Sequence, residues 1–184
     1  MFLDIGFGII ISVVVSKITG HPPNNVFIFL CIGFSLLPDI DVFPELLRRG
    51  KLGGKILDLH RELTHYPLLY AVIAPIIFYL FGLSIASAFV LCLLVHFIHD
   101  SMGGGWGIQW LYPFNKNYFK FFSNQQGSYT WSIAKWNPQQ LRVAMQTHGN
   151  DNWFKDMYLN IKSPILIIET SVLIASILIL FHYI

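Results

Sequence analysis

Long apolar runs separated by short polar clusters dominate the pattern of this chain. The runs cover residues 2–18, 25–37, 66–83, 84–98 and 164–184. A membrane-spanning helix needs about 20 predominantly apolar residues, so the last run predicts a full span and the others predict short, tilted or partly re-entrant helices. Hydrophobic residues make up 54% of the chain and charged residues only 12%, well below the roughly 25% of a soluble domain. The sequence therefore predicts an all-α fold, a polytopic helical membrane bundle with about five spans or partial spans.

The two central runs adjoin each other and raise the question of one helix or two. A straight helix over residues 66–98 would be longer than a bilayer is thick. Gly82 lies near the middle of this stretch, and glycine permits the backbone to turn. We therefore expect a helical hairpin that reverses at Gly82.

Composition divides the chain into three parts: a helical membrane core over residues 1–114, an aromatic and basic segment over 115–162, and a C-terminal transmembrane helix over 163–184. All five Trp residues lie within 103–162 among many Tyr, Phe and Lys residues, which is typical of structure at the lipid headgroup level. We expect the middle segment to form a cap at the membrane surface. Aromatic and basic residues also suit nucleic acid, but no nucleic-acid-binding motif accompanies them, so we expect membrane lipid as the partner and no nucleic acid.

The distribution of basic residues predicts an orientation. Five of the twelve Lys and Arg residues lie within 48–61 and six within 116–162. Basic residues accumulate on the cytoplasmic side of a membrane, and a hairpin at Gly82 places these two segments on the same side. We therefore expect an integral protein of a bacterial-type inner (plasma) membrane, with the amino terminus inside and the polar clusters facing the cytoplasm.

Three polar clusters interrupt the apolar runs near their ends. Eight of the ten Asp, Glu and His residues within 38–103 fall in these clusters. The clusters are Pro38-Asp39-Ile40-Asp41, His60-Arg61-Glu62-Leu63-Thr64-His65 and His96-Phe97-Ile98-His99-Asp100. Imidazole and carboxylate groups together suit zinc and its neighbours in the first transition row, so the clusters predict a divalent metal site, with zinc as the first choice.

The third cluster shows the spacing most clearly. His96 and Asp100 are four residues apart and share one face of a helix, so they can bind one ion. His99 is three residues from His96, but adjacent helical positions point about 100° apart. His99 is therefore a weaker candidate than Asp100. Ionisable groups at membrane depth are costly and usually functional, which favours a site over chance placement.

These motifs, followed by glycines and Tyr112-Pro113-Phe114, resemble the membrane-bound metal-dependent hydrolase family, also described as LexA-binding, inner-membrane-associated hydrolases. The resemblance covers roughly residues 1–114 and implies a metal-dependent hydrolase. Members usually have His near the amino terminus, where this chain has Asp4, a candidate substitute ligand. Members usually have Ser after the second His of the second motif, where this chain has Tyr66. A more distant likeness is to zinc-dependent phospholipase C.

We assign hypothetical roles to the residues of the three clusters. The expected ligands are Asp41, His65, His96 and Asp100, while Asp39 and His60 either orient them or bind a second ion. Arg61 is the candidate anion clamp, because a guanidinium group matches phosphate oxygens, and Glu62 is a candidate base. The favoured activity is hydrolysis of a phosphoester, such as a lipid headgroup.

Two alternatives come from other classes. A non-catalytic regulatory or structural protein would close its metal site with four protein ligands. A transporter would place polar groups near the midplane of several spans, often in internal repeats. The chain shows no such repeat, and its ionisable groups cluster at the ends of the apolar runs.

Overall fold

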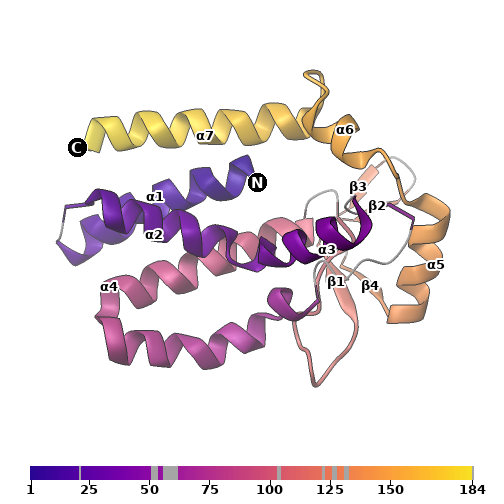
Figure 1. The fold of residues 1–184 in the computed structure, drawn as a ribbon, viewed down its shortest axis with the longest axis horizontal. Coiled ribbons are helices and arrows are strands. Elements are labelled where there is room, and N and C mark those ends of the chain that lie inside the picture. The colour runs from indigo at the N-terminus through magenta and orange to yellow at the C-terminus, as the bar shows by residue number, and fades with distance from the viewer. Residues whose placement is uncertain are drawn as a thin grey trace. The chain divides into compact units, whose positions relative to one another are not determined.

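The computed structural model describes residues 1–20, 22–50, 54–55, 62–102, 105–121, 123–125, 128–130 and 133–183. Helices dominate the described residues (Figure 1). They are α1 (Phe2–Thr19), α2 (Asn25–Leu36), η1 (Pro38–Asp41), α3 (Val42–Arg49), η2 (Leu63–His65), α4 (Pro67–Met102), α5 (Pro138–His148), α6 (Trp153–Tyr158) and α7 (Pro164–Tyr183). This confirms the predicted helical membrane architecture.

The apolar runs of the sequence correspond to α1, α2, the two halves of α4, and α7. By length and composition, α1, α4 and α7 can each cross a membrane. A fourth span exists if Asn25–Leu36 continues through the bend into Pro38–Arg48. The sequence analysis expected a full span only for residues 164–184, whereas α1, with 18 residues, also qualifies.

Helix α4 contains the predicted reversal. Gly82 adopts φ 79° and ψ −177°, a left-handed value of φ that glycine reaches without steric cost. The two helical halves fold back from this point (Figure 1). The hairpin at Gly82 is therefore confirmed.

The chain forms two compact units. Unit 1 consists of Met1–Pro38, Tyr70–His96 and Phe154–Ile184, and unit 2 consists of Asp39–Leu69 and Phe97–Trp153. The boundary near residue 96 falls inside α4, whose helix continues through it.

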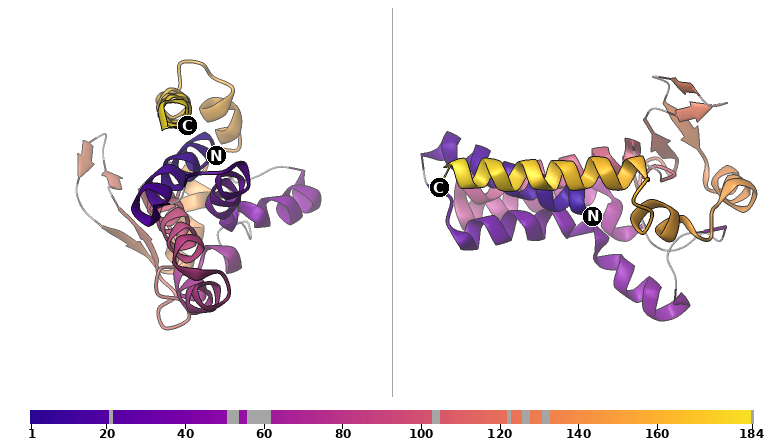
Figure 2. Two further views of the ribbon diagram at one scale, coloured as in Figure 1. Left: turned by 90° about the vertical axis from the view of Figure 1, so that its left-hand side faces the viewer. Right: turned by 90° about the horizontal axis from the view of Figure 1, so that it is seen from above.

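The core of unit 1 lies where α1, α2 and the second half of α4 pack together. Its buried members are Ile11, Val15, Cys31, Ala88 and Cys92. Both cysteines are free thiols with no exposed surface. Helix α7 packs beside α1, as the views of Figures 1 and 2 both show.

Unit 2 contains short strands that the sequence analysis did not predict. Strand β1 (Tyr118–Lys120) pairs antiparallel with β4 (Ala134–Trp136), with Tyr118 opposite Trp136. Strand β2 (Ser123–Gln125) pairs antiparallel with β3 (Ser128–Thr130). Helix α5 follows β4, and its Leu141 and Met145 pack against Tyr118.

Candidate metal centre

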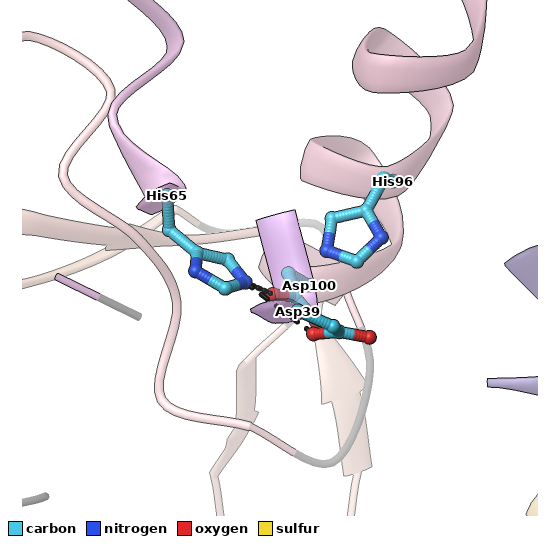
Figure 3. Close-up of side chains that lie close together, drawn as sticks. All are labelled: Asp39, His65, His96 and Asp100. Carbon is cyan, nitrogen blue, oxygen red and sulfur yellow. Dashed lines mark ion pairs between the residues drawn. The ribbon is translucent and has the colours of Figure 1, made fainter. Parts of the chain in front are cut away.

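Within unit 2, His65 contacts three carboxylates, those of Asp39, Asp41 and Asp100. It ends the short helix η2, directly before the Tyr66-Pro67 step that starts α4; proline is favoured at the first position of a helix. The side chain is fully buried. Its Nε2 atom lies 3.1 Å from Asp100 Oδ2 and 3.6 Å from Asp39 Oδ1 (Figure 3).

The opposite nitrogen of His65 contacts a third carboxylate. Nδ1 lies 3.3 Å from Asp41 Oδ2. The Thr64 hydroxyl donates a hydrogen bond of 2.6 Å to the same carboxylate oxygen. Asp39 and Asp41 both come from η1, and this short helix places them toward different nitrogens of the ring.

The three carboxylates determine the protonation of His65. Burial alone lowers the pKa of the imidazole, but the contacts with Asp100, Asp39 and Asp41 outweigh burial and raise this pKa from 6.5 to about 10. At neutral pH the ring therefore carries a proton when no metal neutralises the carboxylates. A bound cation would neutralise the carboxylates in place of the proton and displace it from the ring.

His96 and Asp100 occupy successive turns of α4, as their spacing predicts. His96 is 1% exposed and Asp100 is 7% exposed. No break interrupts α4 between Leu83 and Met102, so the helix itself holds His96 beside Asp100. The closest potential ligand atoms of Asp39, His65, His96 and Asp100 all lie within 4.8 Å of one another (Figure 3).

Within unit 1, His96 has a carboxylate partner on α1. Its Nδ1 atom lies 3.2 Å from Asp4 Oδ1, and Asp4 is 2% exposed. Asp4, our candidate substitute ligand, thus lies against His96. Each histidine therefore has one ring nitrogen beside a carboxylate outside the four-residue cluster.

The donor set of the cluster fits a first-row divalent metal. Two imidazoles and two carboxylates are the ligand types that zinc and its neighbours take. Two donors that bind one tetrahedral zinc ion are about 3.4 Å apart, given bonds of about 2.1 Å. The distances of 3.1 and 3.6 Å from His65 Nε2 to the two carboxylates lie on either side of this value.

The two aspartates of η1 lie beside different ring nitrogens of His65. Asp39, expected either to orient the ligands or to bind a second ion, lies in the cluster. Asp41, expected as a ligand, lies on the far side of His65 beside Thr64. The two residues are close in the sequence, so only the backbone path of η1 distinguishes them.

Two further described candidates, His99 and Glu62, are not among the four residues of this cluster. His99, at the end of the same helix, does not belong to the four residues that the structure brings together. Glu62 precedes η2 and is likewise outside it. The candidates His60 and Arg61 lie outside the described residues. The hydroxyl of Thr64 was not predicted to take part, although its place directly before His65 in the second motif was a usable signal.

The chain has apolar helices of membrane length and a largely buried Asp and His cluster that could hold a metal ion. These features define an integral membrane protein with a candidate metal centre. A profile of the YdjM inner membrane protein family matches residues 4–184. The chain belongs to this family, which confirms the membrane location. Comparisons with curated proteins and with solved structures found no match.

Proposed function

We propose that this protein is a metal-dependent hydrolase that acts on a phosphoester, such as a lipid headgroup, at the membrane surface. The observation that carries the proposal is the largely buried cluster of Asp39, His65, His96 and Asp100, in which each histidine also contacts a carboxylate from outside the cluster. Such backing carboxylates fix the orientation and tautomer of metal-binding histidines. Zinc is our first choice of metal.

The chemistry follows from the residues. A bound divalent metal supplies a Lewis acid and lowers the pKa of water toward about 7. Asp39 and Asp100 contribute negative charge that retains the cation, and Asp41 accepts the Nδ1 hydrogen of His65 so that Nε2 faces the site. Arg61 remains our candidate for binding phosphate oxygens, Glu62 the candidate base, and His60 a further candidate ligand.

The four residues are unequally exposed, and this bears on the choice between a catalytic and a structural centre. His65, His96 and Asp100 are buried, whereas the Asp39 side chain is 28% exposed. A substrate would therefore approach beside Asp39. The second candidate function, a non-catalytic metal-binding protein, draws support from the burial of the other three residues, because a structural site is enclosed by protein ligands.

Hydropathy and basic residues support a cytoplasmic orientation of the site. A reporter fused after Lys51 and one fused at Asn115 should both behave as cytoplasmic. Opposite results from the two fusions would contradict this orientation.

Activity assays on purified protein in lipid nanodiscs test the proposed reaction. Metal content is measured first, followed by hydrolysis of soluble phosphodiesters and of phospholipids with different headgroups. The proposal predicts turnover that disappears with a chelator and returns with zinc. His182→Ala, at the end of α7, serves as a histidine control. Retained metal without turnover on any phosphoester would instead favour the structural alternative.

A further inference from the structure

Glu169 is a buried acidic residue inside the membrane helix α7, with 2% of its surface exposed. Its carboxylate lies at the start of α1, where Oε2 accepts hydrogen bonds from the backbone nitrogens of Phe2 at 3.0 Å and Leu3 at 3.4 Å. The first backbone N–H groups of a helix have no partner within it. Met1 at the N-cap position provides no side-chain hydrogen bond. Glu169 therefore caps α1 from a neighbouring helix.

Two further contacts fix this capping arrangement. The Tyr158 hydroxyl donates a hydrogen bond of 2.9 Å to Glu169 Oε1. One turn along, α1 and α7 approach so closely that a Cβ atom at Gly6 would lie 3.2 Å from the Leu173 backbone. The pairs Phe2 with Glu169 and Gly6 with Leu173 show that the helices run parallel in a defined register.

The capped turn of α1 carries Asp4, whose Oδ1 lies 3.2 Å from His96 Nδ1. The Met1 amino group lies 2.9 Å from Asp4 and 3.2 Å from Glu169. Glu169 is thus connected to His96 through a single helical turn, and all of these residues belong to unit 1.

We infer that Glu169 is a positioning residue for the metal centre: by capping α1 it holds Asp4 against His96 and thereby orients the imidazole. The inference rests on the proposed metal centre but not on the proposed hydrolysis. A purely structural Glu169 would stabilise the helix pair without acting through Asp4.

A double-mutant cycle on zinc affinity separates these roles. The dissociation constant is measured by competition with a chromophoric chelator on the full chain in detergent. Loss of a group that orients a metal ligand typically weakens binding by about 10- to 100-fold. Asp4→Ala should fall in this range and Glu169→Ala near its lower end, about 10-fold. In the Asp4→Ala background, Glu169→Ala should add less than about twofold, because its effect passes through Asp4.

Matched variants complete the experiment. Thr170→Ala removes a neighbouring hydroxyl that bonds within α7, to the Leu166 carbonyl oxygen, and should leave zinc affinity unchanged. Glu169→Gln retains an acceptor oxygen and should recover most of the affinity. If Glu169→Ala does not fold, the cycle is run with Tyr158→Phe, which removes the hydroxyl that holds Glu169.

The outcomes distinguish failure of the positioning role of Glu169 from failure of the proposed metal centre. Two results overturn the positioning role: an unchanged zinc affinity in Glu169→Ala, or an equally large loss of zinc affinity when Glu169→Ala is introduced into the Asp4→Ala variant. If Tyr158→Phe is used in place of Glu169→Ala, either of these results likewise overturns the positioning role. Failure of the unmodified protein to bind any divalent first-row metal overturns the metal centre and the inference together.

Discussion

The two histidines of the candidate metal centre are supported in contrasting ways. We call Asp41, Thr64 and His65 the His65 corner, and Asp4 with His96 the His96 corner. In the His65 corner, a carboxylate from η1 and a hydroxyl adjacent to the histidine support the ring. In the His96 corner, the support comes from α1, which is distant in the sequence.

The comparison indicates which features of the protein can change the metal affinity of the site. The His65 corner lies outside the long helices, and its histidine bears a proton at neutral pH when no metal is bound. The His96 corner depends on packing between membrane helices, including the cap that Glu169 places on α1. We therefore expect protonation to change zinc affinity through the His65 corner, and changes in helix packing to change it through the His96 corner.

The largest effect should come from removing the two cluster residues of α4, His96 and Asp100. His96→Ala and Asp100→Ala should each weaken zinc binding by more than about 100-fold, because a buried charged cluster loses a direct donor. Metal analysis after purification measures the loss. His99→Ala, on the same helix but outside the cluster, should retain the metal; full retention in the His96→Ala, Asp100→Ala double variant would remove this helix from the site.

The next effect concerns turnover rather than metal. Arg61→Lys should keep metal content and reduce the rate of phosphoester hydrolysis by about 30- to 150-fold, equivalent to about 2 to 3 kcal/mol for one charge-assisted contact. Lysine keeps the charge but lacks the planar fork of arginine. A rate equal to that of the unmodified protein would disprove the clamp role. Loss of metal would instead make Arg61 a structural partner of the carboxylates.

Exchanging the supporting carboxylates compares the two corners directly. Asp41→Asn and Asp4→Asn should each weaken zinc binding by about 10- to 100-fold, because each histidine loses a charged acceptor. Zinc titrations against a competing chelator measure both. Since the supports are separate, the double variant should show approximately the product of the two factors. A negligible effect of Asp41→Asn would show that Thr64 alone can orient His65.

The smallest effect for a single step, about tenfold for one pH unit, should arise in the His65 corner. Because the His65 pKa is raised from 6.5 to about 10, its contribution to the stability of the metal-free protein is complete below pH 6.5 and is lost as pH rises through about 10. Zinc must displace this proton, so zinc affinity should rise by about tenfold per pH unit below pH 10 as far as this group alone is concerned. Calorimetry in buffers of different ionisation enthalpy should detect about one released proton per ion. Binding without proton release would contradict a protonated His65.

Much of the membrane fold was predictable because it depends on length and composition. Residues 66–98 exceed a bilayer as one helix, and Gly82 provides the turn that the structure contains. Strands β1 to β4 were missed because each has only three residues, and so short a segment carries almost no periodic pattern.

The site was predictable in its residue types but not in all of its contacts. His96 and Asp100 share a helical face by spacing alone. The different positions of Asp39 and Asp41 depend on the local path of η1, and the contact between Asp4 and His96 depends on how α1 packs. Neither spacing nor composition contains that information.

X-ray absorption at the zinc edge of the metal-loaded protein tests the central claim most directly. Coordination by Asp39, His65, His96 and Asp100 predicts one ion per chain, only nitrogen and oxygen neighbours at about 2.0 to 2.2 Å, and the scattering pattern of two imidazoles. A sulfur neighbour at about 2.3 Å would instead place the metal at Cys31 or Cys92. That result, or the absence of imidazole scattering, would contradict the assignment of this centre.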